Sequence, residues 1–276
     1  MRYKLIISDY GETIVHTGED IHNENIKAIK DYQNKCGLFS IATGREWSSI
    51  KRKLNKNDMI TLASMPIICC YGSLIVISKE ERVIFDKSIN LDIIIDLVHF
   101  FSTNNIPYSL VTMHKTLLRS NVDVSCYVWK QYDNQVKFNS DEEILNYLKS
   151  ENTKIYKIDV YSLDLLIKLN NYLNKKYSVT FKQYTNKLGF VEFVSAEGGK
   201  ESAYTFLKEY YVLDHEEIIV VGDSPNDVGL FKNALNKVAV SNAVEEILAT
   251  STYIIDNKDY LGINRLINKV LEGEVL

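Results

Sequence analysis

The chain has 276 residues, of which 46% are hydrophobic and 25% charged, with a net charge of −4 at pH 7. This is the composition of an ordinary globular protein, long enough for one large domain or two smaller ones. The sequence shows no concentrated basic segment of the kind that binds nucleic acid. It also has no run of 18 apolar residues and no signal-peptide pattern, so we expect a cytoplasmic protein without membrane spans.

The cysteines and histidines give no sign of a metal or disulfide framework. None of the four cysteines forms a C-x-x-C pair, and the five histidines lack the spacing of a zinc site. We therefore expect reduced and mostly buried thiols, as is usual for free cysteine.

The first 72 residues alternate strands with helices. An apolar strand at residues 5–7 runs into a polar turn, a helix is predicted over 23–35, and further strands over 38–42 and 66–71. A second helix is expected to end near Leu54. Strands that alternate with helices in this way predict a parallel sheet in an α/β fold.

The pattern changes after residue 72. A hairpin is predicted from residues 73–77 and 82–86, and the segment up to about residue 190 mixes short strands with two helices, at 91–102 and 163–174. The strands of this segment are expected at residues 108–111, 125–129, 155–161, 179–182 and 189–194. We interpret the segment as an inserted α+β domain.

The α/β pattern returns after Lys200. A helix is followed by a buried strand at residues 217–221, a polar loop at 222–227, and short strands at 238–240 and 253–255. We predict a doubly wound α/β core formed by residues 1–85 and 190–276. The inserted domain would then comprise residues 86–189.

Polar residues follow the predicted strands at the places where α/β sheets bind ligands. Asp9 follows the first strand, Thr43 the second, Lys200 begins a helix, and Asp223 and Asp227 follow a late strand. A carboxylate can attack phosphorus, further carboxylates can bind magnesium, and a lysine with a hydroxyl can hold phosphoryl oxygens. These residue types are therefore suited to phosphoryl transfer.

The order of these polar segments resembles that of a known protein family. The segments DYGET at residues 9–13, TGR at 43–45, Lys200, and GDSPND at 222–227 resemble, in order, the four motifs of the haloacid dehalogenase superfamily. The insertion between the second and third motifs, and the segment at residues 238–243, resemble the Cof-type sugar-phosphatase branch. The resemblance implies a magnesium-dependent phosphatase with an α/β cap, acting on a small phosphorylated metabolite.

The resemblance also implies a role for each matching residue. Asp9 would be the nucleophile and a magnesium ligand, together with the backbone carbonyl of Gly11 and the carboxylate of Asp223. Asp227 would bind the metal or orient its water. The phosphoryl group and substrate would be held by Thr43, Gly44, Arg45, Lys200 and Asn226.

Residue 11 departs from the family pattern. The family usually has a second Asp there, which protonates the leaving oxygen, and this chain has Gly11 followed by Glu12. Losing such an acid typically lowers the rate by about 10²–10⁴. Three outcomes stay open: Glu12 or a cap residue supplies the proton, the substrate has a better leaving group or reacts slowly, or turnover has been lost. Tyr71 also replaces the Asn usual before Gly72.

Two rival functions remain beside the phosphatase. One is a phospholigand-binding or regulatory protein on the same fold. The other is a carbon–phosphorus hydrolase, which would need a Schiff-base lysine in the cap, where Lys130, Lys154 and Lys182 are present. A Walker loop and a dinucleotide fingerprint are both missing from the sequence. The sequence identifies neither the substrate nor the oligomeric state.

Overall fold

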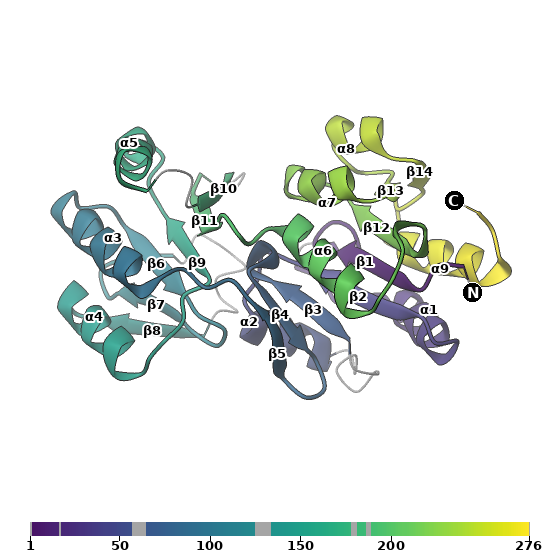
Figure 1. The fold of residues 1–276 in the computed structure, drawn as a ribbon, viewed down its shortest axis with the longest axis horizontal. Helices are drawn as coiled ribbons and strands as arrows, with labels where there is room; N and C mark the ends of the chain where they lie inside the picture. Colours follow the sequence, from purple (N-terminus) through teal and green to yellow (C-terminus); the bar gives the residue numbers. More distant parts are fainter. Residues whose placement is uncertain are drawn as a thin grey trace.

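The computed structural model describes residues 2–16, 18–56, 65–124, 134–177, 181–185 and 189–275. These residues form two lobes, each built on its own β-sheet (Figure 1). Both chain ends belong to the first lobe, and the middle of the chain forms the second. None of the helices in the described ranges is long and apolar enough to cross a membrane.

The first lobe is an α/β structure, as predicted. Its sheet has eight strands among the described residues, parallel from β14 to β3 and antiparallel at β4 and β5. In spatial order the strands are β14 (Tyr253–Ile255), β13 (Asn236–Val240), β12 (Ile218–Gly222), β1 (Leu5–Asp9), β2 (Leu38–Ala42), β3 (Pro66–Cys69), β4 (Leu74–Ile77) and β5 (Arg82–Asp86).

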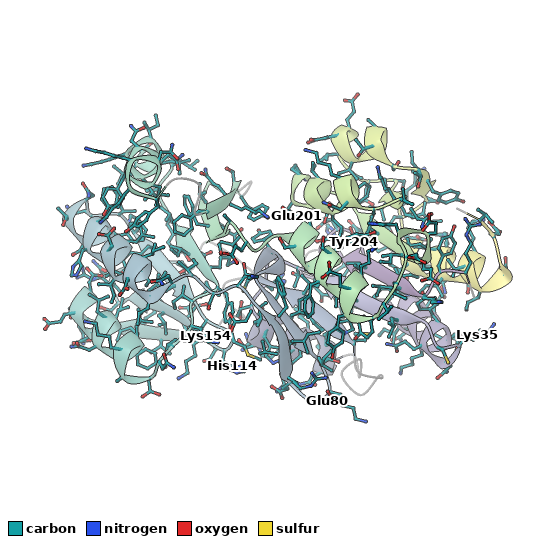
Figure 2. All side chains as sticks on the ribbon, in the orientation of Figure 1. Lys35, Glu80, His114, Lys154, Glu201 and Tyr204 are labelled. Atoms are coloured by element: carbon teal, nitrogen blue, oxygen red, sulfur yellow. The ribbon has the colours of Figure 1, made fainter. Side chains whose placement is uncertain are left out.

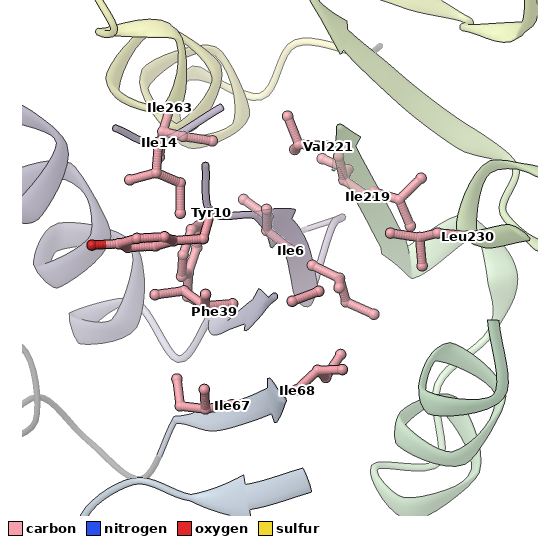
Figure 3. Packing of buried hydrophobic residues seen from close by; sticks show 14 of the residues in the cluster. Ile6, Tyr10, Ile14, Phe39, Ile67, Ile68, Ile219, Val221, Leu230 and Ile263 are labelled. Carbon is pink, nitrogen blue, oxygen red and sulfur yellow. The ribbon is translucent and has the colours of Figure 1, made fainter. Parts of the chain in front are cut away.

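Helices flank this sheet and cover its apolar strands. They are α1 (Asn23–Asn34), α2 (Trp47–Lys56), α6 (Lys200–Tyr210), α7 (Val228–Asn233), α8 (Glu245–Thr250) and α9 (Gly262–Glu272), with short 3-10 turns η1 (Cys70–Gly72), η3 (His215–Glu217) and η4 (Pro225–Asp227). Figure 3 shows Ile6, Phe39 and Ile219 from neighbouring strands packed into one core. Because β1 lies at the centre of the sheet, its carboxyl end at Asp9 is enclosed by neighbouring strands on both sides.

The second lobe contains a mixed sheet with helices on its outer side. Its six described strands are, in spatial order, β10 (Phe181–Thr185), β11 (Val191–Ser195), β9 (Lys157–Val160), β6 (Tyr108–Val111), β7 (Thr116–Arg119) and β8 (Gln135–Phe138). Figure 1 shows α3 (Leu91–Thr103), α4 (Asp141–Ser150) and α5 (Leu166–Lys176) on the side away from the first lobe. The opposite side of the sheet faces the first lobe. We call this lobe the cap.

The cap contains more structure than the sequence pattern predicted. The prediction of two helices missed α4, and it also missed β7 and β8. A start signal for α4 is present, since Ser140 caps the helix by accepting a hydrogen bond from the Glu143 backbone at 3.2 Å. The predicted strand at residues 125–129 lies outside the described residues.

The predicted return to the core at residue 190 is too early. The strand β11 pairs with β9 and β10 in the cap sheet, so the cap sheet extends to Ser195. The first lobe resumes with α6 at Lys200. The predicted boundary at residue 85 lies one residue before the end of β5 at Asp86.

Candidate active site

The site is built around a buried lysine at the start of α6. Lys200 is fully buried, and its Nζ donates hydrogen bonds to Asp9 Oδ1 at 2.5 Å, Asp227 Oδ1 at 2.6 Å and Asn226 Oδ1 at 2.7 Å. Asp9 ends β1, whereas the other two partners lie in η4 after β12. The sheet thus brings the first, third and fourth motifs together, as the sequence resemblance implied.

The charges around Lys200 keep its side chain protonated. Burial alone would lower the pKa of Lys200, but the negative charges of Asp227 and Asp9 outweigh it and raise the pKa above its ordinary value. The site therefore holds a fixed positive charge beside Asp9. Such a charge is suited to binding the oxygens of a phosphoryl group.

Asp227 is held rigidly by both of its carboxylate oxygens. Oδ1 accepts from Lys200, while Oδ2 accepts from the backbone amides of Asp223 at 3.1 Å and Ser224 at 3.2 Å. A Cβ at Gly222 would lie only 2.7 Å from the carboxyl carbon of Asp227. Glycine at the end of β12 therefore lets the Asp227 carboxylate approach the backbone closely.

Asp223 and Asp9 are carboxylates in an unfavourable electrostatic setting. Burial, followed by the charge of Asp227, raises the pKa of Asp223 to about 7, although a hydrogen bond from Thr13 Oγ1 at 3.0 Å opposes this. Burial also raises the pKa of Asp9 well above its ordinary value; Lys200 opposes the change, and Asp227 and Asp223 add to it. Another cation beside these groups would relieve the repulsion.

The three aspartates form a candidate metal site. One carboxylate oxygen from each of Asp9, Asp223 and Asp227 lies within 4.8 Å of the other two, and all three residues are buried. Carboxylate oxygens are the hard donors that Mg²⁺ takes in phosphoryl-transfer sites, together with water and phosphate oxygens. The donor set therefore fits the magnesium ion that the sequence predicted.

The second motif lies beside this cluster at the end of β2. Thr43 is buried, and its Oγ1 accepts a hydrogen bond from the Arg45 amide at 3.2 Å, which leaves the hydroxyl proton available to a ligand. A Cβ at Gly44 would overlap the ring of Tyr71, so the close approach of Tyr71 requires glycine there. The contacts of the described residues do not join the Arg45 guanidinium to Asp9.

The turn after Asp9 places the Glu12 carboxylate beside Tyr260 and His16, and its negative charge contributes to the raised pKa of Asp223. Glu12 has a φ of 59°, in the left-handed region where the family has Gly. Its Oε2 accepts a hydrogen bond from the Tyr260 hydroxyl at 2.7 Å and lies 3.0 Å from His16 Nδ1. The use of Glu12 as a substitute acid stays a prediction.

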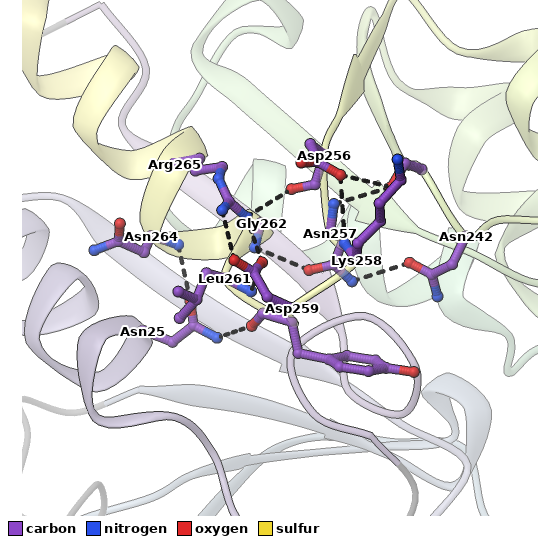
Figure 4. A network of polar contacts seen from close by, with 12 residues as sticks. Asn25, Asn242, Asp256, Asn257, Lys258, Asp259, Leu261, Gly262, Asn264 and Arg265 are labelled. Carbon is purple, nitrogen blue, oxygen red and sulfur yellow. Dashed lines mark hydrogen bonds and ion pairs between the residues drawn. The ribbon is translucent and has the colours of Figure 1, made fainter.

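Residues near the far end of the chain hold this turn in place. Asn257 Nδ2 donates to the carbonyl of Thr13 at 3.1 Å and to Asn242 Oδ1 at 3.1 Å, and Asn242 donates to the Glu12 carbonyl at 2.7 Å. The Asn257 side chain also accepts from the Gly262 amide at the start of α9, as Figure 4 shows. We call Asn242, Asn257 and Tyr260 the C-terminal clamp.

A second buried lysine lies where the cap meets the core. Lys157 on β9 is 4% exposed; it pairs with Glu192 on β11 and donates to the Gly44 carbonyl at 3.2 Å. The Tyr71 hydroxyl donates to Glu192 Oε2 at 2.5 Å, and the Tyr71 ring stacks on Tyr184 of β10 with centroids 4.1 Å apart. We call these four side chains, Tyr71, Lys157, Tyr184 and Glu192, the junction cluster.

Sequence reasoning missed most of the junction cluster. Tyr71 was noted as a departure from the family, but Lys157 and Glu192 belong to no motif. The available signal was the presence of charged residues in two buried cap strands, Lys157 and Asp159 in β9 and Glu192 in β11. Because a buried charge is unfavourable without a partner, charged residues on buried strands indicate ion pairs or hydrogen bonds between those strands.

The cap lysines named for the carbon–phosphorus alternative have other partners. Lys182 donates to the Gly198 carbonyl at 2.5 Å and to Glu201 at 2.6 Å, and Figure 2 shows Glu201 at the edge of the core that faces the cap. Lys154 pairs with Asp86 at 2.5 Å on the surface. Lys130 lies outside the described residues. The contacts of the two described lysines do not join either one to Asp9.

Taken together, the fold and site define a class of α/β proteins with an aspartate after the first strand, a buried lysine, two further aspartates and a mixed-sheet cap. The sequence model of the haloacid dehalogenase-like hydrolase family matches residues 6–267. The chain belongs to this family, and the resemblance inferred from the four motifs is confirmed.

Relatives of known name extend the match over the whole chain. The 5-amino-6-(5-phospho-D-ribitylamino)uracil phosphatase YwtE of Bacillus subtilis is 24% identical, with 98% of this chain and 99% of that protein covered. A haloacid dehalogenase-like hydrolase structure from Bacteroides thetaiotaomicron superimposes with a TM-score of 0.84 at 19% identity, covering 97% and 99%. The subclass IIB sugar phosphatase BT4131 gives a TM-score of 0.77 at 18% identity, covering 97% and 98%. These structures share the fold of both lobes.

Proposed function

We propose that the protein is a magnesium-dependent phosphatase that hydrolyses a small phosphorylated metabolite through a phospho-aspartate at Asp9. The observation that carries the proposal is the contact of Lys200 with both Asp9 and Asp227, beside Asp223. Full-length similarity to YwtE, a phosphatase by name, and the fold shared with the sugar phosphatase BT4131 support it.

In this proposal Asp9 Oδ attacks phosphorus and the substrate oxygen leaves. Lys200 and the Thr43 hydroxyl hold the phosphoryl oxygens, and Asp227 keeps Lys200 aimed at Asp9. Asp9, Asp223, Asp227 and the Gly11 carbonyl would hold magnesium, which supplies charge neutralisation for the phosphoryl group. Water then cleaves the acyl phosphate.

The other residues predicted to bind substrate are Gly44, Arg45 and Asn226. Gly44 and Arg45 follow Thr43, and Asn226 is held next to the phosphoryl site by Lys200. The junction cluster holds the cap over the Gly44 loop, since Lys157 donates to the Gly44 carbonyl. In this arrangement the cap limits the access of water and selects the leaving group, as closing lids do.

Phosphate release from a panel of phosphorylated metabolites with magnesium tests the proposal. We expect turnover by the wild type, loss of at least about 10³-fold in Asp9→Asn, and no loss in Asp20→Asn, a surface carboxylate paired with Lys56. A hydroxylamine-sensitive phosphate on the peptide that contains Asp9, found by mass spectrometry, would identify the nucleophile. Turnover that survives in Asp9→Asn contradicts the mechanism.

The glycine at position 11 favours one alternative to the phosphatase function. In this alternative the protein has the same fold and binds a phosphorylated ligand, but its catalysis is impaired. The position lacks the usual acid, while the residues that hold metal and phosphate remain. In that case calorimetry detects a phosphorylated ligand that binds with magnesium, the wild type releases no phosphate from it, and Gly11→Asp gains activity. Turnover by the wild type excludes this alternative.

A further inference from the structure

The substitution at position 11 leaves unfilled space in the first motif. A Cβ built on Gly11 meets no heavy atom within 4 Å outside its own chain neighbours. Gly11 is also absent from the residues whose φ is positive, so a larger side chain fits there without backbone strain. The structure therefore contains the room for a catalytic carboxylic acid without containing the acid.

The other carboxylates of the first and fourth motifs are already engaged. Asp227 accepts hydrogen bonds on both oxygens, Asp223 accepts from Thr13, and Glu12 is turned toward Tyr260 and His16. Among the described residues, no atom outside the chain neighbours of Gly11 fills the space at that position. Glu12 hydrogen-bonds to Tyr260, and its charge acts on Asp223. A proton donor has to come from elsewhere, or the reaction has to proceed without one.

The core and cap side chains around the second motif that could donate a proton are phenols and ammonium groups. Tyr184 stacks on Tyr71, and the Tyr71 hydroxyl already donates to Glu192. Lys157 is paired with Glu192, and Lys182 with Glu201. Phenol and ammonium groups ordinarily have pKa values of about 10, so they release a proton to a leaving oxygen less readily than a protonated carboxyl group does.

Without an acid, the leaving group has to depart as an anion. The rate penalty for a missing acid is about 10²–10⁴ for a poor leaving group. It becomes smaller as the leaving oxygen becomes less basic, because less negative charge then requires a proton in the transition state. A site of this kind therefore discriminates between phosphate esters by the acidity of the alcohol that they release.

We propose that this site selects phosphate monoesters whose leaving oxygen is weakly basic, such as aryl, enol or anomeric phosphates, over ordinary alkyl phosphates. This inference rests on the proposed phosphatase function and adds the substrate class. The Asp9 oxygen forms a bond to phosphorus, the bond from phosphorus to the leaving oxygen breaks, and the leaving group takes the electron pair and later a proton from water.

The lack of an acidic side chain at position 11 also affects the hydrolysis of the phospho-aspartate. Water attacks the acyl phosphate, the bond from Asp9 to phosphorus breaks, and the proton of the water passes to solvent instead of to an aspartate at position 11. This step is the same for every substrate. The phospho-aspartate therefore accumulates when the leaving group is good, and kcat becomes independent of the leaving group.

A series of aryl phosphates with graded phenol acidity, extended by simple alkyl phosphates, tests the inference. For the wild type, log(kcat/KM) should fall steeply as the leaving group becomes more basic, and the most reactive esters should show a burst of about one phenolate per site. Gly11→Asp should flatten the slope, with a gain of about 10²–10⁴ on alkyl phosphates and little gain on the most reactive aryl esters. Gly11→Asn, equal in size but without a transferable proton, should keep the steep slope.

The outcomes separate the inference from the proposed function. If the wild type hydrolyses the series with a slope as shallow as that of Gly11→Asp, the phosphatase function stands and the substrate-class inference is overturned. If Gly11→Asn flattens the slope as much as Gly11→Asp, filling the space is what matters and the inference is again overturned. If every ester is inert and no phosphate is trapped on Asp9, the proposed function fails and the inference fails with it.

Discussion

The molecule contains two buried lysines that look alike locally and differ in what they join. Lys200 is fully buried and Lys157 is 4% exposed, and each pairs with two carboxylates. The partners of Lys200 are Asp9 at the end of β1 and Asp227 in the turn η4 after β12, both in the core lobe. Lys157 pairs with Asp159 and Glu192 in the cap and also reaches a core carbonyl at Gly44.

The difference shows that a buried lysine paired with two carboxylates can either form part of a candidate active site or connect the cap to the core. Lys200 and its partners all belong to the core lobe, so their contacts do not depend on the position of the cap. Lys157 connects two lobes, so its contact with Gly44 exists only while the cap lies against the core. In both places the pairing with carboxylates offsets the cost of burying the lysine, because a buried unpaired charge would lower the free energy of unfolding by several kcal/mol.

Removing the charge of Lys200 should have the largest effect on turnover. We expect Lys200→Met to lower kcat/KM by about 10²–10³ or more, because the phosphoryl oxygens lose a preorganised cation. Circular dichroism of the folded variant is the control for misfolding. A loss no greater than that of Lys157→Met would show that the two lysines do not differ in role.

Removing the charge of Lys157 should act mainly on folding and cap closure. Breaking a buried pair leaves Glu192 and Asp159 without their cation, which typically costs about 3–5 kcal/mol. Urea unfolding measures this loss, and KM should rise more than kcat falls. Lys154→Met, which removes an exposed pair with Asp86, is the matched control and should cost at most about 1 kcal/mol.

The pH dependence of stability should reveal the carboxylates around Lys200. Burial and neighbouring charge raise the pKa of Asp223 to about 7 and also raise that of Asp9, so their protonated forms favour the folded state. Without metal, this stabilisation is present below about pH 4 and is lost as the pH rises through about 7.

Magnesium should reverse that trend, because it binds the deprotonated carboxylates. We expect the gain in unfolding free energy on adding magnesium to be larger at pH 7.5 than at pH 5.5, by on the order of 1–3 kcal/mol. Urea titrations with and without the ion measure the difference. Asp223→Asn should reduce it, and an equal gain at both pH values would speak against a carboxylate metal site.

The smallest effect is expected at the aromatic part of the junction cluster. Tyr71→Phe keeps the stack on Tyr184 and removes only the hydrogen bond to Glu192, so a loss of about 1 kcal/mol is expected by urea unfolding. A double-mutant cycle with Glu192→Gln should show that the two changes are coupled. Additive effects would mean that this hydrogen bond contributes little to closure.

The two lysines also differ in how far their roles could be predicted from the sequence. Lys200, Asp9, Asp223 and Asp227 were predictable because short motifs follow strands in a fixed order, and the α/β sheet then places strand ends together. Lys157 was not predictable in the same way, since its partner Glu192 lies on another strand of the cap and pairing depends on tertiary register.

Local signals explain the other differences. The helix α4 begins at a capping pattern that is visible in the sequence, with Ser140 accepting a hydrogen bond from the Glu143 amide. The position of Glu12 in the sequence suggests a substitute acid, but its side chain is oriented by a contact with Tyr260, 248 residues away in the chain. Side-chain direction of this kind cannot be derived from spacing.

The C-terminal clamp has a consequence for how the protein is made. Asn242 and Asn257 bind the carbonyls of Glu12 and Thr13 across separations of 230 and 244 residues. The turn that carries the nucleophile is therefore translated long before the residues that hold it in shape. While the chain is still being synthesised it already contains the first motif, but the hydrogen bonds from the clamp to the turn can form only after the clamp has left the ribosome.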